Sequence, residues 1–87
     1  MKTTKSRTYG YAICIKNADY PASLELHKIY RVLPDEDAAQ DGDLRIIDES
    51  DEDYLYPADY FLPLTLPLPQ LNTLKKSFTN ATLINQR

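Results

Sequence analysis

The chain contains one cysteine and one histidine, a common nucleophile and a common general base of enzymes. Cys14 lies within an alternating apolar run, where a small buried thiol is expected, and His27 precedes a strand-like segment, where exposure is expected. Covalent catalysis needs a nucleophile, a base within hydrogen-bond reach and a third group that orients the base. Because the sequence does not bring such partners together, we predict a protein without enzymatic activity.

The thirteen acidic residues direct attention to cation binding, and the segment from Asp37 to Asp48 is where a calcium loop can be tested. An EF-hand loop that began at Asp37 would have Ala39 at its third position, where an oxygen ligand is required. Pro34 and a predicted strand flank the segment in place of two helices. A single cysteine also excludes a cysteine-based zinc site and a CxxC pair. We expect no bound metal and no cofactor.

Charge is distributed unevenly along the 87 residues, whose net charge is −3. Residues 17–69 contain all thirteen acids, whereas residues 1–16 and 70–87 contain only basic charges. An acidic body is poorly suited to a phosphate backbone, which binds clustered Lys and Arg. We therefore do not expect nucleic acid as a partner. The basic ends leave one alternative open, an RNA- or ribosome-associated protein that uses them as arms.

Length and composition indicate one small domain. At 43% hydrophobic residues, with six prolines and seven tyrosines, the chain suits a compact β structure better than a helical bundle. Its first eight residues are too polar for a signal peptide, and its apolar runs are too short to cross a bilayer. We expect a monomeric, cytoplasmic protein of bacterial type without membrane contact.

The segment 44–64 predicts the central part of the fold. Residues 44–48 are mainly β-branched or apolar, residues 54–56 are aromatic and apolar, and acids and serine separate them, which is the signature of a β-hairpin. The turn has no glycine, so we predict that Asp51 adopts the left-handed conformation. Pro57 should end the second strand, because proline has no N–H to donate. A one-turn corner and a last short strand follow.

Two strands are predicted before this hairpin. Residues 9–16 alternate, with Tyr9, Tyr11, Ile13 and Ile15 on the heavier face. The small residues on the opposite face remain a second candidate for burial; these are Gly10, Ala12 and Cys14. Residues 24–33 have apolar side chains of one parity if the backbone stays extended, and residues 28–33 form the second strand, which Pro34 ends. An acidic loop with one helical turn, closed by Gly42, leads to the hairpin.

Together these elements predict five strands near residues 9–16, 28–33, 44–49, 53–57 and 61–64. The predicted core consists of Ile13, Leu24, Leu26, Tyr30, Val32, Ile46, Tyr56 and Phe61. Alternating prolines at residues 65–69 favour an extended exit from the sheet. We expect a flexible N-terminus over residues 1–8, a barrel over 9–69, and a flexible or short-helical tail over 70–87.

Two segments resemble SH3 domains. Residues 24–33 look like the SH3 segment that leaves the RT loop and enters the second strand, and in residues 55–61 Pro57 and Tyr60 flank an expected 3₁₀ turn. More closely, residues 28–33 and 46–57 resemble a group of small uncharacterised bacterial and phage proteins of SH3-like type, which usually have glycine where Asp51 stands. The resemblance implies an all-β, five-stranded SH3-like barrel. Such barrels serve several functions, so the resemblance specifies fold more than activity.

The resemblance also implies a partner-binding face. Tyr60 and Pro57 match the tyrosine and proline of the SH3 groove, but the chain has no tryptophan and lacks the aromatic-rich RT-loop motif. We predict a non-enzymatic interaction module that docks a basic or proline-containing protein segment on a tyrosine-lined face rimmed by acids. Its predicted residues are Asp19, Tyr20, Asp35, Glu36, Asp37, Tyr56, Pro57, Asp59 and Tyr60. The alternative is that these tyrosines are half-buried barrel residues with hydrated hydroxyls.

Overall fold

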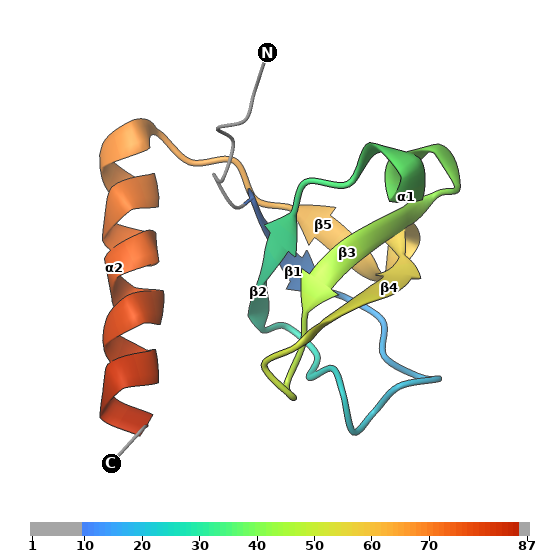
Figure 1. The fold of residues 1–87 in the computed structure, drawn as a ribbon, viewed down its shortest axis with the longest axis horizontal. Coiled ribbons are helices and arrows are strands. Elements are labelled where there is room, and N and C mark those ends of the chain that lie inside the picture. Colours follow the sequence, from blue (N-terminus) through green and yellow to red (C-terminus); the bar gives the residue numbers. More distant parts are fainter. Residues whose placement is uncertain (1–9, 86–87) are drawn as a thin grey trace.

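The structure is a computed structural model that describes residues 10–85, with side chains described for residues 10–80. Five antiparallel strands form one sheet in the order β4-β3-β2-β1-β5. Their bounds are Gly10–Cys14 (β1), Ile29–Leu33 (β2), Asp43–Ile47 (β3), Asp53–Pro57 (β4) and Phe61–Pro63 (β5). The sheet curls into a half-barrel, and the helix α2 (Leu68–Asn85) stands beside it (Figure 1). The prediction of five strands is confirmed, whereas the predicted N-terminus, residues 1–8, lies outside the described residues.

The predicted hairpin and corner are confirmed. β3 pairs with β4 so that Leu44 lies opposite Tyr56 and Ile46 lies opposite Tyr54. Asp51, in the turn, has a φ of 69°, which is the left-handed conformation that the turn without glycine requires. After β4 a single 3₁₀ turn, η1 (Ala58–Tyr60), leads directly into β5. This turn moves the chain from one edge of the sheet to the other.

The face of β1 that packs into the core cluster is the one with small side chains, while Tyr11 on the other face is buried against Phe78. Ala12 and Cys14 are 1% and 0% exposed, whereas Ile13 is only partly buried, so the predicted core position of Ile13 is wrong. The aromatic rings of the core supply the physical reason: Tyr30 and Phe61 lie edge to face at 6.3 Å, and Tyr56 lies 6.4 Å from Phe61. These large rings fill the concave side of the sheet. Small residues on β1 are what such a core accommodates.

A backbone reversal before β2 overturns a second core assignment. His27 has a φ of 66°, so residues 24–33 are not one extended segment. Leu24 is fully buried, but Leu26 is 44% exposed and is not part of the core. The prediction placed Leu24 and Leu26 on one face with side chains of β2, because alternate residues of an extended strand share a face. The left-handed residue changes the direction of the side chains that follow it, so this alternation does not continue into β2. The remaining predicted core residues pack together, with Val32 only partly buried.

Two helices flank the strands. The predicted helical turn in the acidic loop is α1 (Glu36–Gln40), which Asp35 caps by accepting a hydrogen bond from the Ala38 N–H, and Gly42 follows it with a φ of 80°. Residues 64–67 connect β5 to α2 (Leu68–Asn85) without a regular element. With 18 residues, α2 is longer than the predicted short helix, so the description of the chain as all-β is too narrow.

The helix α2 contacts the convex side of the sheet through a few side chains. The Phe78 ring lies 5.4 Å from the Tyr11 ring, and the Arg31 guanidinium lies over Phe78 at 5.3 Å. Leu71 and Leu74, which share the predicted face with Phe78, are partly buried. No helix within residues 10–85 is both long enough and apolar enough to cross a membrane.

Candidate functional site

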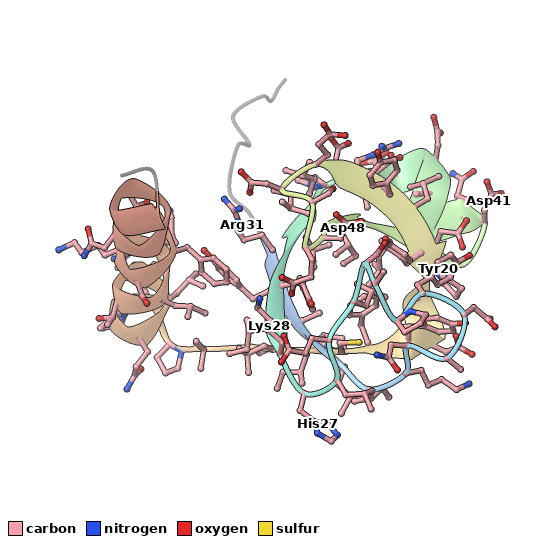
Figure 2. The ribbon with its side chains drawn as sticks, turned by 90° about the horizontal axis from the view of Figure 1, so that it is seen from below. Tyr20, His27, Lys28, Arg31, Asp41 and Asp48 are labelled. Atoms are coloured by element: carbon pink, nitrogen blue, oxygen red, sulfur yellow. The ribbon has the colours of Figure 1, made fainter. Side chains whose placement is uncertain are left out.

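Three tyrosine rings form a cluster at the end of the half-barrel that lies away from α2. Tyr20 comes from the segment between β1 and β2, Tyr56 from β4 and Tyr60 from η1. The Tyr20 ring meets the Tyr56 ring edge to face at 5.0 Å and lies 6.0 Å from the Tyr60 ring. Figure 2 shows Tyr20 on the opposite side of the molecule from α2. Tyr20 is 40% exposed, whereas Tyr56 and Tyr60 are 4% and 8% exposed.

Local hydrogen bonds give the segment that carries Tyr20 a defined shape. The Tyr20 N–H donates to the Asn17 carbonyl at 2.9 Å, and the Leu24 N–H donates to the Tyr20 carbonyl at 3.0 Å. The Asn17 side-chain amide donates in turn to the Leu24 carbonyl at 2.9 Å. Because the fully buried Leu24 anchors this segment in the core, Tyr20 is held against the other two rings.

The turn between β3 and β4 is joined to the same segment through Glu49. Its N–H donates to the Ser23 carbonyl at 3.0 Å, and its Oε2 accepts from Lys28 Nζ at 2.6 Å and from the Tyr30 hydroxyl. Burial acts to raise the pKa of Glu49, but the hydrogen bonds from Lys28 and Tyr30 outweigh it and lower the pKa below its usual value. The carboxylate therefore ties the turn to the loop in its charged form.

Asp48 is the buried acid of the site, with 6% exposure. Its Oδ1 accepts from the Ser50 N–H at 2.9 Å and from the Ser50 hydroxyl at 2.5 Å, and its Oδ2 accepts from the Tyr56 hydroxyl at 2.5 Å. Burial opposes the charged form, yet these hydrogen bonds prevail and lower the pKa of Asp48. Burial and the bond to Asp48 raise the pKa of Tyr56 to about 12. Asp48 is thus an ionised carboxylate inside the protein.

Tyr60 is held in a different way. Its hydroxyl donates to Asp19 Oδ2 at 2.6 Å, and this bond is the main reason that its pKa is raised to about 12. Lys16 places its ammonium 5.8 Å from the Tyr60 ring and 4.0 Å from the exposed Asp59 carboxylate. The side of the cluster at Tyr60 therefore already carries a cation of this chain.

Two shallow hollows lie beside the tyrosine cluster. One, of about 360 Å³, is lined by residues 15–19 together with Leu26 and Tyr60. The other, of about 380 Å³, is lined by Tyr20, Ser23, Asp48, Ser50, Tyr54, Leu55 and Tyr56. Tyr20 and Tyr60, which line different hollows, are in ring contact, so the two hollows adjoin one cluster. An extended segment that crossed the Tyr20 ring would reach both.

The structure brings together only part of the predicted face. Asp19, Tyr20, Tyr56 and Tyr60 lie together, and Asp59 is linked to them through Lys16. The acids at residues 35–37 line neither of these hollows, and Asp35 caps α1 and accepts from Arg45 Nε at 2.7 Å. Pro57 is the last residue of β4, directly before η1, and lines neither of these hollows.

Several residues of the site were not predicted. They are Ile15, Lys16, Asn17, Ala18, Leu26, Ser23, Asp48, Ser50, Tyr54 and Leu55. One signal for them was present in the sequence, because Asp48 and Ser50 are two residues apart, the spacing at which an aspartate accepts from the backbone in a turn. Ile15 and Leu26 line the same hollow because the backbone reverses at His27, and no local feature of the sequence predicts this reversal.

Comparison of the chain with models of protein families, with curated proteins and with solved structures finds no match.

Proposed function

We propose that the chain is an SH3-like interaction module without enzymatic activity, which docks a partner protein on the tyrosine face. This face is defined by Asp19, Tyr20, Tyr56, Tyr60 and the residues that line the two hollows. The SH3-like assignment rests on the strand order β4-β3-β2-β1-β5 together with the single 3₁₀ turn between β4 and β5. This is the arrangement that the sequence resemblance implies.

The observation that carries the proposal is the position of Tyr20. An aromatic ring that is 40% exposed rests on two buried rings, lines one hollow and contacts Tyr60, which lines the other. A tyrosine held in this way loses little side-chain entropy when a partner covers it, and such rings contribute strongly to binding at interfaces. An exposed ring held in place by buried rings is typical of an interaction surface. Packing of the barrel requires only Tyr56 and Tyr60, so it does not explain the position of Tyr20.

The charges favour a partner segment with a basic residue next to an apolar or proline anchor. Acids border the face at Asp19, Asp48 and Glu52, while Lys16 is the basic residue that lines one of its hollows. An apolar anchor on the rings would supply most of the affinity, and the exposed charges would contribute mainly association rate and specificity. We expect a dissociation constant of about 1 μM or weaker, because the area is small and lacks tryptophan.

The test is NMR chemical-shift mapping of the full chain with basic, proline-containing peptides, or with the native partner once it has been isolated. We expect shifts at Tyr20, Tyr56 and Tyr60, and weaker binding at higher salt as the charges are screened. Tyr20→Ala should reduce the affinity at least fivefold. The exposed Leu62→Ala on β5, which lines neither hollow, is the matched control and should leave the affinity unchanged.

The alternative function gives a different result in the same experiment. If RNA or heparin binds at moderate salt, and the shifts are confined to basic positions such as Lys75 and Lys76 on α2, the nucleic-acid function replaces the proposed one. Shifts at the tyrosine face with peptide, and none at α2, exclude that alternative.

A further inference from the structure

The hollow of about 380 Å³ combines three tyrosine rings with a buried carboxylate. Tyr20, Tyr54 and Tyr56 line it, and so does Asp48, which is 6% exposed. Figure 2 shows Tyr20 and Asp48 in the half of the molecule away from α2. Aromatic faces attract cations through the ring quadrupole, and a buried negative charge does so directly. Both features of the lining therefore favour a positively charged ligand.

The charge of Asp48 is not balanced by a cation of the described chain. Ion pairs among residues 10–80 join Lys16, Lys28 and Arg31 to one acid each and Arg45 to two acids, and none of these acids is Asp48. Buried charges are normally paired, because an isolated charge is costly to remove from water. Here hydrogen bonds from Ser50 and Tyr56 stabilise the carboxylate, but they carry no formal positive charge. A bound cation would supply the missing counter-charge.

The rings of this hollow also differ from other tyrosines of the protein. Lys16 lies over the Tyr60 ring at 5.8 Å, and Lys28 lies over the Tyr30 ring at 5.6 Å. Within the described side chains, the cation–ring contacts use Tyr60, Tyr30 and Phe78 and not Tyr20, Tyr54 or Tyr56. Tyr20 and Tyr54, which are 40% and 50% exposed, are thus available to a cation from outside the chain, while the buried Tyr56 ring lies behind Tyr20 in edge-to-face contact.

The hydrogen bonds at Asp48 select the kind of cation. A carboxylate offers about four lone-pair sites, and Ser50 occupies both sites on Oδ1 while Tyr56 occupies one on Oδ2. A guanidinium needs two oxygens side by side, and a primary ammonium brings three N–H donors that require acceptors. A quaternary ammonium requires none. Its methyl groups can lie on the rings while its charge is felt by Asp48.

We propose that this hollow binds a quaternary ammonium group. The ligand chemistry is a trimethylammonium, whether on a small molecule such as choline or on a trimethylated lysine of a partner segment. This inference deepens the proposed function, since the hollow is one half of the tyrosine face, but it can be tested without a partner protein.

The test is a titration of the full chain with choline and with 3,3-dimethyl-1-butanol, which has the same shape without the charge. We expect choline to shift the amide signals of residues 20, 48 and 54 and to show upfield-shifted methyl protons from the ring currents. The neutral analogue should bind at least fivefold more weakly. Equal binding of the two compounds, or tighter binding of methylguanidinium or methylammonium than of choline, would overturn the inference.

Two variants and one control keep the test decisive. Asp48→Asn should weaken choline binding at least fivefold, and Tyr54→Leu should do the same while changing only a half-exposed ring. Leu62→Ala should leave binding unchanged. If Asp48→Asn does not fold, Tyr54→Leu alone decides, and unchanged binding in that variant sinks the inference.

Two further experiments make separate distinctions. One tells a small-molecule ligand from a partner segment, and the other tells this inference from the proposed function. A trimethyllysine peptide that binds more tightly than choline assigns the site to a partner segment, whereas equal affinity assigns it to a free small molecule. Choline binding together with failure of every peptide and partner would remove the proposed function and retain this inference. Peptide binding at Tyr20 without choline binding would overturn this inference and retain the proposed function.

Discussion

The segment between β1 and β2 and the helix α2 are both added to the same half-barrel, but they are attached in different ways. The segment is hydrogen-bonded to β1, to η1 and to the hairpin turn, with the Ile15 N–H donating to the Tyr60 carbonyl at 2.8 Å and the His27 N–H to the Cys14 carbonyl at 2.7 Å. It also inserts Leu24 into the core with no exposed surface. Within the helix side chains described, residues 68–80, the aromatic contact to the sheet is made by Phe78, packed against Tyr11 and Arg31.

This difference indicates which added segment belongs to the cooperative unit of the fold. A segment that contributes a buried core residue and satisfies strand N–H groups must form together with the barrel. A helix with a half-buried face and an exposed Leu68 can separate from the barrel with a smaller loss of apolar contact. The candidate site lies on the segment that is firmly attached, which suits a preformed binding surface.

The largest expected contrast is between core substitutions in the two segments. Leu24→Ala should cost about 2–5 kcal/mol of the free energy of unfolding, because it leaves a cavity in the core. Phe78→Ala should cost about 1 kcal/mol, because its ring is only partly buried on the convex side. Urea unfolding of both variants measures the difference. An equal loss would show that α2 is part of the core unit and would break the comparison.

A second contrast concerns two hydroxyl groups of the hairpin. Tyr56→Phe removes the donor to the buried Asp48 and should cost about 1–3 kcal/mol, because a desolvated carboxylate then lacks one partner. Tyr54→Phe removes a bond to Glu52 on the surface and should cost less than about 0.5 kcal/mol. Thermal or urea unfolding of the two single variants provides the test. Similar losses would mean that Asp48 does not depend on its Tyr56 contact.

Acid should weaken the tyrosine end before it affects α2. The folded-state pKa values of Asp48 and Glu49 are lowered, so their contribution to stability is present above their unfolded values of about 4 and is lost as the pH falls through the folded values. Amide signals of residues 17–28 should therefore broaden or shift below about pH 4, ahead of those in α2. The Asp48→Asn variant should lose part of this pH dependence. If the Asp48→Asn variant keeps the pH dependence of the wild-type chain, the attribution of this dependence to Asp48 is wrong.

The smallest expected effect sharpens the description of α2. Leu68 is 67% exposed at the start of the helix, so Leu68→Ala should change the free energy of unfolding by less than about 0.5 kcal/mol. Urea unfolding beside the wild-type chain is sufficient to measure this. A loss above 1 kcal/mol would mean that Leu68 is covered in solution, by α2 packing or by a second copy.

Local sequence determined the elements that depend on a few neighbouring residues. The hairpin, the left-handed Asp51, the helical turn before Gly42 and the 3₁₀ turn after Pro57 were all predicted, because turn chemistry and proline geometry act over two to five residues. The strands were predicted from the alternation of apolar and other side chains, which also depends on a few neighbouring residues. Three tyrosines of the site, Tyr20, Tyr56 and Tyr60, were also predicted, on the basis of the SH3 resemblance, whereas Tyr54 was not.

Tertiary structure decided which face is buried and what lines the site. The alternation in β1 was visible, but only the aromatic rings across the barrel determine that Ala12 and Cys14 are inside and Ile13 is not. His27 reverses the backbone between Leu26 and β2, and nothing in the neighbouring residues signals this. Asp48 is buried because Tyr56 and Ser50 donate to it in the folded hairpin. A sequence specifies side-chain types, whereas burial and hydrogen-bond partners depend on segments that meet only after folding.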